Sequence, residues 1–595
     1  MPISYILYNE SYMTRLESLQ KAQSKKQFAK ILGLNASFLT RTLYIRQIES
    51  QYNRFEIPKR NGGFRTINAP MDELKDIQSR LSKLLLDCVD EINKSKNIVP
   101  KLSHGFTRHR SIISNAEKHI NRKNVLNIDL SDFFGSFNFG RVRGFFIKNS
   151  NFLLHKDIAT VIAKISCLNN SLPQGSPCSP VITNLIAHPL DIRLASLAKR
   201  NSCTYTRYAD DITFSSRDKE FSPEIIKMEE FTVLIGNTLR KEIERAGFKI
   251  NDKKTRVQFC DSRQDVTGLV VNEKVSITRE YWKTTRSMCH KLFTTGAYIK
   301  VMPNGEVEGT IGELQGRLNF IDSVDKYNRN CPKGPIDHKY QNKNNGLDYR
   351  ALLNVREKMF SKFLYYRNFY ANDKPTILCE GHTDYIYLRS AISMLAKQYP
   401  LLANEKTETT PYELLVNFLN YSKRTRYLLD LYGGGIYIKK FTERYQENLK
   451  FYRKTIPINP VILLLDNDSG PDILLNHLIT EESKYSHCSK SKEEIRSSEF
   501  IHITSNLYLV LTPRINNDKP SMMENLFDES ALNILVDGRK FDPNKDADSI
   551  TTYGKNTFAT KVVQERKTTI SFEGFKPLLN RVESVIQYHN RLSAS

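Results

Sequence analysis

The spacing of hydrophobic positions changes several times along the 595 residues. Residues 1–50 show helical spacing, and from 51 to about 258 short apolar strands alternate with helical stretches. The helical spacing returns from 275 to about Phe369, and a polar stretch at 326–348 predicts a loop. After the segment 371–375, strands and helices alternate again. The pattern predicts several domains, because a chain of this length rarely folds around one core.

The first 50 residues contain a recognisable helix start and stop. Ser24 and Gln27 have the spacing of a capping box, Phe28 and Ile31 follow on one face, and Gly33 ends the helix. Residues 29–41 are similar to a helix-turn-helix, although short helical pairs are more often packing elements than readers of DNA.

Three features of the middle region predict strands that carry polar chemistry. Residues 55–57 and 66–67 flank a basic, glycine-bearing tip at 59–63, which is typical of a hairpin. An apolar strand at 125–130 carries Asp129 near its end. Residues 204–214 read as two short strands around a turn with Asp210 and Asp211.

The last third contains three apolar runs that each end at or near an acid. These runs are 376–380, 426–431 and 461–466, with Glu380, Asp430 and Asp466. Such runs indicate buried parallel strands, and functional groups gather at the carboxyl ends of parallel strands.

The charge narrows the choice of partner. The chain holds 88 Lys and Arg against 65 Asp and Glu, a net charge of +23, which favours a polyanion such as nucleic acid. Its nine cysteines form no CxxC pair, which argues against a zinc finger and for free thiols in a reducing cytosol. No signal peptide or membrane span is expected, so we predict a cytoplasmic protein without a membrane partner.

The acids of the middle region suit nucleotidyl transfer. Asp129 lies 210 − 129 = 81 residues before Asp210, and Asp211 follows directly. Transfer of a nucleotide uses two Mg²⁺ ions bridged by carboxylates, one at the attacking hydroxyl and one at the leaving pyrophosphate. An acidic turn alone is weak evidence, because turns favour Asp.

The order of three motifs makes the evidence more specific. A strand ending at Asp129, the loop LPQGSP at 172–177 and YADD at 208–211 resemble the palm of reverse transcriptases. The resemblance implies that Asp129, Asp210 and Asp211 bind two Mg²⁺ ions and that Gln174 lies beside the incoming nucleotide.

Further residues follow from the same resemblance. The hairpin around 57–65 is similar to the fingers, where Lys59 and Arg65 would grip the triphosphate, and Lys254 would assist departure of pyrophosphate. Phe134 occupies the position that in this family excludes a ribose 2′-OH and so selects deoxynucleotides. The alternative, that Phe134 is an ordinary core residue, stays open.

Two short motifs resemble those of bacterial retron reverse transcriptases over about residues 20–370. These are NAxxH from Asn115 to His119 and VTG from Val266 to Gly268. The resemblance implies a bacterial RNA-directed DNA polymerase that binds a structured noncoding RNA and primes from the 2′-OH of an internal guanosine. The product would be branched multicopy single-stranded DNA (msDNA). We expect the RNA on the basic face of the thumb, at Arg279, Lys283, Arg286 and Lys291.

A second acidic group lies in the last third. Glu380 and the pair Asp466 and Asp468 follow predicted strands, and together they could bind one or two Mg²⁺ ions. They resemble a TOPRIM domain, with Glu380 as general acid/base and the two aspartates as metal ligands. Since no DNA-gate tyrosine domain or primase zinc module is evident, the resemblance favours a nuclease. Glu524 and Lys555 resemble the distal acid and lysine of such nucleases, with ordinary surface residues as the equal alternative.

The predicted fold is multidomain α/β: a right-hand polymerase with fingers, α+β palm and helical thumb, followed by a Rossmann-like α/β TOPRIM domain. The expected domains are 1–50, an N-terminal helical region; 51–258, fingers and palm; 259–370, thumb and linker; and 371–595, the TOPRIM domain. This order resembles retrons with a fused TOPRIM effector in anti-phage defence. An RNA-binding scaffold with a vestigial polymerase and a group II intron-like enzyme remain alternatives. The sequence leaves open the RNA, the effector's substrate, the phage trigger and a homo-oligomer.

Overall fold

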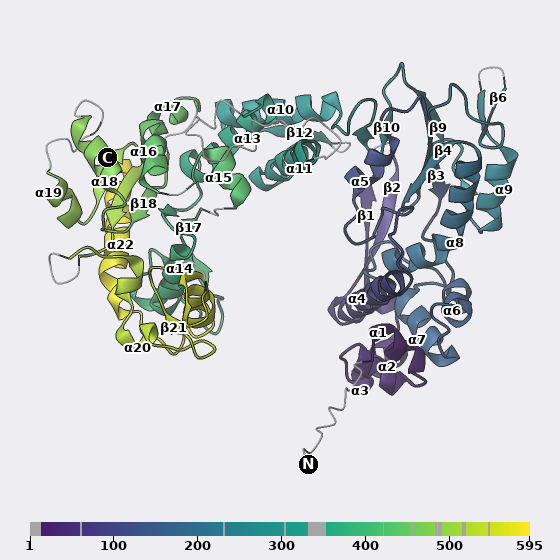
Figure 1. Ribbon diagram of the computed structural model, residues 1–595, viewed down its shortest axis with the longest axis horizontal. Helices are drawn as coiled ribbons and strands as arrows, with labels where there is room; N and C mark the ends of the chain where they lie inside the picture. Colours follow the sequence, from purple (N-terminus) through teal and green to yellow (C-terminus); the bar gives the residue numbers. More distant parts are fainter. Residues whose placement is uncertain are drawn as a thin grey trace, which may run out of the picture. The chain divides into compact units, whose positions relative to one another are not determined.

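The chain divides into two compact units, which are described separately (Figure 1). The computed structural model describes residues 13–59, 62–229, 232–302, 305–330, 353–419, 422–432, 434–453, 457–481, 485, 491–514, 519–545 and 548–594. The N-terminal unit comprises Met1–Tyr281 with Val324–Gly334. The C-terminal unit comprises Trp282–Ser323 with Pro335–Ser595. The predicted domain boundaries at 258 and 370 stay predictions.

Short helices open the N-terminal unit: α1 (Arg15–Lys21), α2 (Lys25–Ile31), α3 (Ala36–Thr40) and the π-helical turn η1 (Arg41–Ile45). The predicted capping box is present, since the Gln27 N–H donates to Ser24 Oγ at 3.3 Å and the Ser24 N–H donates to Gln27 Oε1 at 3.1 Å. Gly33 stands at φ +68° just after α2, where the left-handed conformation ends a helix. The helical prediction is confirmed for residues 15–45, and residues 1–12 lie outside the described residues.

An antiparallel hairpin follows, as the sequence predicts. It consists of β1 (Tyr52–Pro58) and β2 (Phe64–Pro70), paired from Tyr52 opposite Pro70 to Pro58 opposite Phe64. The tip residues 60 and 61 lie outside the described residues. The long helix α4 (Asp72–Ser95) leads from the hairpin into the body of the unit.

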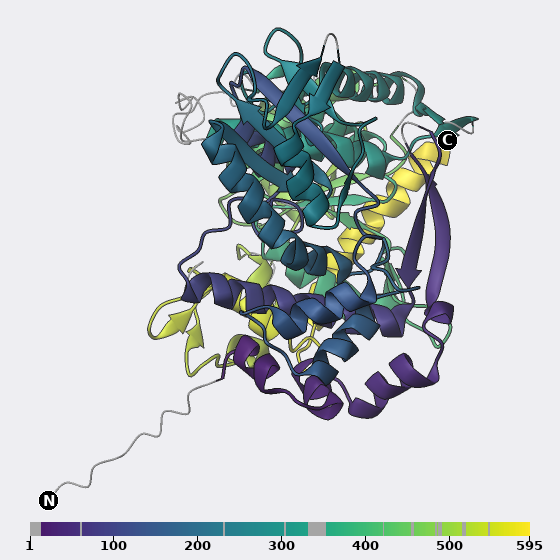
Figure 2. The ribbon, with the colours of Figure 1, turned by 90° about the vertical axis from the view of Figure 1, so that its right-hand side faces the viewer.

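The centre of the N-terminal unit is an antiparallel sheet of order β4-β5-β3-β8, with β9 also paired to β3. Its strands are β3 (Asn124–Ser131), β4 (Cys203–Tyr208), β5 (Asp211–Ser216), β8 (Lys249–Ile250) and β9 (Arg256–Phe259). Helices α6 (Phe139–Lys148), α7 (Lys156–Ser166), α8 (Ser179–Arg200) and α9 (Asn237–Arg245) accompany it (Figure 2). Leu126, Ile128 and Phe214 from the sheet belong to the same buried core as residues of these helices.

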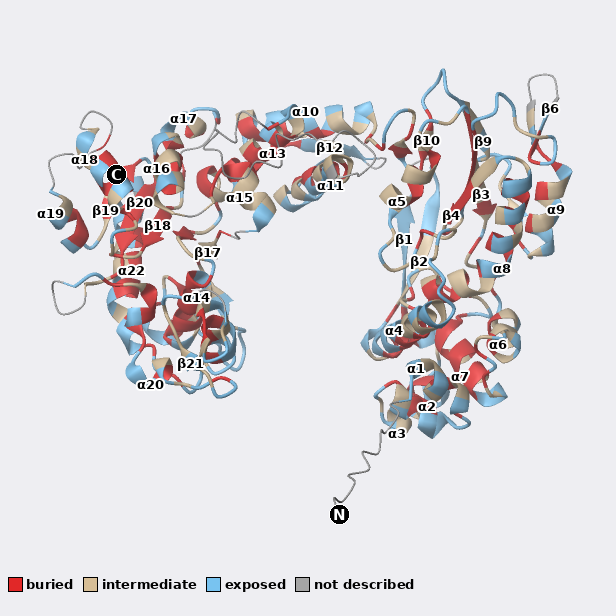
Figure 3. Cartoon of the chain, viewed as in Figure 1, coloured by how far each residue is buried: buried red, intermediate tan, exposed pale blue. Residues whose placement is uncertain are grey.

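The C-terminal unit joins helices and a sheet, and alternate residues of the sheet strands belong to two separate hydrophobic clusters. Its helical part has α10 (Arg279–Thr295) from Trp282 onward, the hairpin β12 (Ile299–Met302) and β13 (Gly305–Glu308), α11 (Ile311–Asn330) as far as Ser323, α13 (Val355–Tyr365) and η5 (Tyr366–Tyr370). Leu318 of α11 and Phe363 of α13 share a hydrophobic cluster with Leu463 of the sheet. Figure 3 shows buried residues, in red, in both the helices and the sheet of this unit. Helix α11 continues to Asn330, so the loop prediction is wrong for 326–330, and 331–348 lies outside the described residues.

The sheet of this unit has the order β17-β14-β18-β20-β19. The first four strands in this order are parallel: β17 (Asn417–Phe418), β14 (Thr376–Cys379), β18 (Val461–Leu465) and β20 (Leu507–Leu511). The edge strand β19 (Ile501–Thr504) is antiparallel to β20. Strands predicted at 376–380 and 461–466 are confirmed, and the fold is the mixed α/β type that the sequence predicts.

One predicted strand is a helix. Residues 426–429 of the predicted run 426–431 lie in α15 (Lys423–Leu429), where the Thr425 N–H donates to Ser422 Oγ at 3.1 Å, and Asp430 caps the end of the helix. Leu428 and Leu429 are buried in the shared core. A short apolar run fits a buried helix as well as a strand, and here the N-cap and the packing favour the helix.

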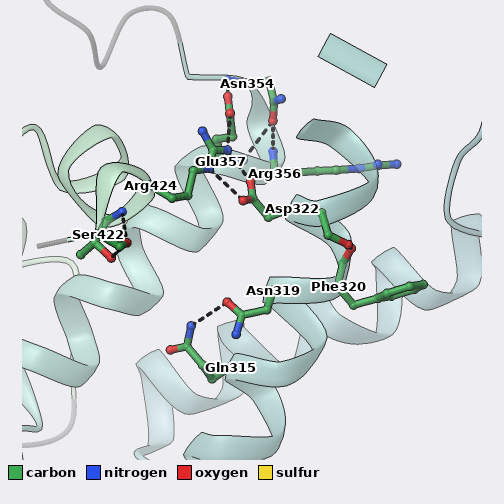
Figure 4. Close-up of polar contacts among 11 residues, drawn as sticks. Gln315, Asn319, Phe320, Asp322, Asn354, Arg356, Glu357, Ser422 and Arg424 are labelled. Carbon is green, nitrogen blue, oxygen red and sulfur yellow. Dashed lines mark hydrogen bonds and ion pairs between the residues drawn. The ribbon is translucent and has the colours of Figure 1, made fainter. Parts of the chain in front are cut away.

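An ionic group inside the C-terminal unit ties three of its helices together (Figure 4). Arg424 of α15 donates from Nε to Asp322 of α11 at 2.8 Å and from Nη2 to Glu357 of α13 at 2.6 Å. Burial opposes the charge of Arg424, but the hydrogen bonds and charges of the two carboxylates raise its pKa above the ordinary value. Glu357 is 1% exposed, so its pairing with Arg424 replaces lost hydration.

The remaining elements complete the two units. In the N-terminal unit they are η2 (Glu49–Gln51), α5 (Ile112–Ala116), η3 (Glu117–His119), β6 (Ile226–Glu229), β7 (Thr232–Ile235), β10 (Asp265–Val266) and β11 (Leu269–Val270). In the C-terminal unit they are α14 (Asp384–Met394), η6 (Ala396–Gln398), β15 (Ala403–Asn404), β16 (Glu413–Leu414), α16 (Gly435–Glu443), α17 (Tyr445–Leu449), α18 (Asp472–Thr480), α19 (Lys492–Ser497), η7 (Met523–Leu526), α20 (Glu529–Leu532), β21 (Lys540–Phe541), β22 (Thr552–Tyr553), α21 (Lys555–Thr557), η8 (Phe558–Gln564), η9 (Glu573–Phe575) and α22 (Lys576–Ala594). Within the described ranges, none of the helices has the length and apolar character needed to cross a bilayer.

Candidate active sites

The register of the central sheet brings the three predicted aspartates together. Asp129 of β3 stands directly opposite Asp211 of β5. The Leu130 N–H donates to the Asp210 carbonyl at 3.0 Å, which fixes the acidic turn against β3. Carboxylates 81 residues apart in the chain are therefore held by backbone hydrogen bonds at one end of the sheet.

A buried ion pair supports the turn. Arg207 of β4 and Asp191 of α8 are fully buried, and Arg207 Nε donates to Asp191 Oδ1 at 2.7 Å. Arg207 Nη1 also donates to the Ala209 carbonyl at 3.0 Å. Ala209 has φ +57°, a conformation that costs free energy for a residue with a Cβ, so the arginine holds the strained residue that precedes Asp210.

The three carboxylates repel one another. Burial raises the pKa of Asp211 to about 7, and the charges of Asp210 and Asp129 add to the rise. Burial and the Asp129 charge likewise raise the pKa of Asp210. Lys254 offsets part of this charge, since its Nζ lies 3.0 and 3.2 Å from the two Asp129 carboxylate oxygens, and Asn251 Nδ2 donates to Asp129 Oδ2 at 3.0 Å. Such a site gains stability from an added cation.

The predicted nucleotide-binding residues differ in their relation to this cluster. Arg65 on β2 lowers the pKa of Asp210 by its charge, so its guanidinium acts on the cluster, while Lys59 lies exposed where β1 ends. The loop that carries Gln174 packs against β2, since the Asn68 N–H donates to the Gln174 carbonyl at 2.8 Å. Gly175 follows at φ +115°, and a Cβ there would lie 2.7 Å from the Asn68 carbonyl oxygen. Only glycine permits this close approach of loop and hairpin.

Phe134 is half-buried five residues after Asp129. Its ring lies edge-on to Phe133, with 5.6 Å between centroids, and 6.4 Å from the ring of Phe106. The ring is thus held by aromatic neighbours in the loop that follows β3.

The two short motifs also meet in space. Thr267 Oγ1 donates to the carbonyl of Ile112 in α5, the helix that contains Asn115, at 3.4 Å. Thr267 and Gly268 have φ +48° and +81°, so VTG forms a tight hairpin turn in a conformation rare for threonine. His119 is fully buried with its ring nitrogens 2.7 Å from Ser215 Oγ and Thr206 Oγ1, and burial lowers its pKa to about 3. It is therefore a neutral structural link between η3 and the central sheet.

A second acidic group forms at the ends of β14 and β18 in the C-terminal unit. These strands are parallel neighbours, so Glu380 and Asp466, the residues that follow them, lie at the same edge of the sheet. Gly470 lies between Glu380 and Asp468: a Cβ there would be 3.0 Å from Asp468 Oδ1 and 3.5 Å from Glu380 Oε1. Burial, Asp468 and a further acid, Asp384, raise the pKa of Glu380.

Asp384 is a member of this group to which the sequence analysis gives no role. It begins α14, is 7% exposed, and its Oδ2 accepts from the Gly381 N–H at 2.8 Å. Burial raises the pKa of Asp466 to about 8, with Asp384 and Glu524 contributing further. The signal available in the sequence is the position of Asp384 four residues after Glu380, one helical turn into the following element.

Glu524 and Lys555, which the sequence supports only weakly, are members of this second acidic group. Lys555 Nζ lies 3.1 Å from Glu524 Oε1, and the Met523 N–H donates to Asp466 Oδ1 at 2.9 Å. Glu524 is 2% exposed, and no hydrogen bond reaches its Oε2 from the described part of the chain. Burial disfavours the charge of Lys555, but Glu524 and the neighbouring aspartates raise its pKa, so it stays a cation among five carboxylates.

The basic residues proposed for RNA lie on α10. Arg279, Lys283 and Arg286 are exposed and follow helical spacing i, i+4, i+7, which places them in one stripe, whereas Lys291 is exposed on another side of the helix.

Among the described residues, no three acidic, histidine or cysteine side chains are arranged so that they could hold a metal ion. Each acidic group offers carboxylate oxygens and contains one lysine close to a carboxylate, Lys254 at Asp129 and Lys555 at Glu524.

Comparisons with known proteins identify the N-terminal region. The family described as reverse transcriptase (RNA-dependent DNA polymerase) matches residues 57–278. The retron Ec86 reverse transcriptase of Escherichia coli is 35% identical over 289 residues, which cover 48% of this chain and 80% of that protein. The retron Mx162 reverse transcriptase of Myxococcus xanthus is 36% identical over 338 residues, covering 52% of this chain and 66% of that protein.

Proposed function

This chain belongs to the family of retron reverse transcriptases, and we propose that it copies a structured noncoding RNA into branched msDNA. The N-terminal region is an RNA-directed DNA polymerase by its family. The supporting observation is the placement of Asp129 opposite Asp211 with Asp210 in the adjoining turn. In the proposed reaction, a 2′-OH of a guanosine in the RNA is the first primer and deoxynucleotides are the substrates.

The donor set of the palm fits Mg²⁺. Carboxylate oxygens are the ligands that this ion prefers, and the buried, mutually repelling carboxylates gain stability from a cation. Asp129, Asp210 and Asp211 would hold it, and the bound ions would supply charge neutralisation at the attacking and leaving oxygens. Lys254 then exchanges its contact with Asp129 for the leaving pyrophosphate, a step that its exposed, flexible side chain allows.

Basic and aromatic residues complete the proposed site. Arg65 and Lys59 on the hairpin bind the triphosphate, and Gln174 lines the nucleotide position. Phe134 blocks a 2′-OH on the incoming sugar. Phe134→Ala should raise incorporation of ribonucleotides relative to deoxynucleotides by roughly tenfold or more, because the steric barrier is removed. Primer extension with each nucleotide class measures the ratio, and an unchanged ratio would return Phe134 to the role of a core residue.

Production of msDNA tests the main proposal. The chain is co-expressed with its flanking RNA locus, and total nucleic acid is examined for branched single-stranded DNA. Asp210→Asn with Asp211→Asn should abolish the product, while Asp261→Asn, on an exposed turn, should leave it unchanged. Branched DNA made by the double variant would refute the assignment.

For the C-terminal unit we propose a TOPRIM-type nuclease that acts as the effector of an anti-phage system. The supporting observation is the gathering of Glu380, Asp466 and Asp468 at neighbouring parallel strand ends. Glu380 acts as general acid/base, which its raised pKa favours at neutral pH. Asp466 and Asp468 would hold one or two Mg²⁺ ions, and Lys555 stabilises charge on the phosphoryl group. The polymerase with its RNA–DNA product would restrain this activity until infection.

Toxicity separates the two activities. Glu380→Gln removes the proposed acid/base while keeping shape, so it should relieve growth arrest when the effector is released without changing the yield of msDNA. Glu447→Gln, on α17, serves as a surface control. Growth arrest that persists in Glu380→Gln would exclude a catalytic Glu380.

The stripe Arg279, Lys283 and Arg286, with Lys291, is proposed to bind the RNA, and replacing all four by Gln should weaken that binding.

A further inference from the structure

The N-terminal helices carry an unusual charge distribution. Residues 18–48 contain no Asp or Glu, and they hold six cations: Lys21, Lys25, Lys26, Lys30, Arg41 and Arg46. Arg41 and Arg46 both pair with one carboxylate from α4, that of Glu73, at 3.1 and 2.9 Å. Within the described ranges no ion pair is formed by the four lysines, all of which are exposed. The segment therefore presents a strongly positive surface.

The fold of this segment is a helix-turn-helix. Helix α2 ends at Ile31, Gly33 turns the chain at φ +68°, and a second helix runs through α3 and η1 from Ala36 to Ile45. Leu39 and Leu43 of the second helix are buried, whereas Ser37, Arg41 and Tyr44 are exposed at spacing i, i+4, i+7. The second helix thus presents one polar stripe outward.

Two lysines from separate helices converge on Tyr44. Lys25 Nζ of α2 lies 4.2 Å from the centre of the Tyr44 ring, and Lys164 Nζ of α7 lies 4.0 Å from it. The two ammonium groups are thus within 4.2 + 4.0 = 8.2 Å of each other. Asp157 is the acid whose charge acts on the Tyr44 hydroxyl, which has a pKa raised first by burial and then by Asp157. The aromatic ring fixes both cations, while their mutual repulsion favours a bound anion.

Further cations stand beside the turn. An open groove of about 790 Å³ is lined by Lys26, Lys30, Gly33 and Asp76. Asp76 is paired with Arg80 at 2.9 Å, so it does not neutralise the two lysines of the groove. Cations therefore flank the turn and the second helix of the helix-turn-helix.

We propose that this helix-turn-helix, with Lys164, is a second RNA-binding surface that contacts the phosphates of a double-stranded stem. Charge complementarity carries the argument: the four exposed lysines of residues 18–48, together with Lys164, outnumber the nearby acids and fit the dense phosphate charge of a duplex. The narrow major groove of A-form RNA does not admit a recognition helix, so contact with the backbone suits an RNA stem. The identity of that RNA, the cognate noncoding RNA, rests on the proposed function.

Binding of the purified full chain to the transcribed noncoding RNA tests the surface. Lys25→Gln with Lys164→Gln should weaken binding roughly tenfold near 0.1 M salt and make the plot of log K against log salt less steep by about 1–2. Lys25→Arg with Lys164→Arg keeps the charge and should restore binding. Lys241→Gln on α9 is the matched surface control. An affinity and a salt slope equal to those of wild type would overturn the inference.

Further measurements separate failure of the RNA-stem inference from failure of the proposed function. Extension of a short DNA primer on an RNA oligonucleotide should be unchanged in Lys25→Gln with Lys164→Gln, since the palm is intact. A larger loss of affinity for a 20-base-pair DNA duplex, or for vesicles of anionic lipid, than for the RNA would also overturn the choice of an RNA stem. A wild-type chain that extends primers but does not prefer the noncoding RNA would instead refute the RNA partner of the proposed function.

Discussion

In the N-terminal unit the acidic residues face one another across antiparallel strands, whereas in the C-terminal unit they follow parallel ones. Asp129 and Asp211 are placed by one strand pair and its turn. Glu380 and Asp466 need two strands separated by a long crossover, and Glu524 and Lys555 arrive from still later elements. Each group contains one lysine bound to a carboxylate, Lys254 with Asp129 and Lys555 with Glu524.

The difference shows two ways to keep repelling carboxylates together. In the first site the backbone and the buried Arg207–Asp191 pair set the geometry, while Lys254 is largely exposed. In the second site the lysine is itself part of the structure, since Lys555 is 23% exposed and Glu524 almost fully buried. We therefore expect the first site to depend on its supporting ion pair and the second on its lysine.

Arg207→Met should have the greatest effect on stability. It leaves Asp191 as an unpaired buried charge and should lower the free energy of unfolding of the N-terminal unit by about 3–5 kcal/mol. Thermal or urea unfolding of the full chain measures the change. Arg207→Met with Asp191→Leu removes both charges and should recover much of the loss. A single variant as stable as wild type would show that the acidic turn does not rely on this pair.

The pH dependence of stability without divalent ions tests the free-energy cost of burying these carboxylates close to one another. Because their folded pKa values, about 7 for Asp211 and about 8 for Asp466, lie above the unfolded values, folding takes up protons below these pH values. Stability should therefore fall as the pH rises from 5 to 8, by ~3 kcal/mol for each residue. Asp211→Asn and Asp466→Asn should each flatten the profile, measured by thermal unfolding in EDTA. The same slope in wild type and both variants would contradict the assignment.

The two lysines should differ when removed. Lys555→Met leaves Glu524 buried without its cation and should destabilise the C-terminal unit by about 1–3 kcal/mol. Lys254→Met should change stability by less than about 1 kcal/mol, because its ion pair is exposed on the lysine side, but should slow nucleotide addition. Unfolding curves and single-nucleotide extension rates separate the two effects. Equal losses of stability would remove the contrast between the sites.

The sequence predicted the palm aspartates because an acid at a strand end and an acidic hairpin turn leave local marks. It could not distinguish helix from strand at 426–431, where an apolar run fits both and the Ser422 cap decided the outcome. Asp384 was left without a role because a spacing of four residues from Glu380 is common in helices, and its closeness to Glu380 and Asp466 is evident only in the folded unit. The contact of Lys555 with Glu524 depends on tertiary structure and has no local signature.

The change of hydrophobic pattern after the segment 371–375 gave no sign that the helices before it share a hydrophobic cluster with the sheet that follows. Leu318 and Phe363 share the core of the sheet, and Arg424 clamps α11 and α13 to α15. A ligand that tilts α11 or α13 must therefore also displace the hydrophobic cluster that supports the strands of the second acidic group. The helices and the strands that carry Glu380 and Asp466 at their ends therefore share one packed cluster.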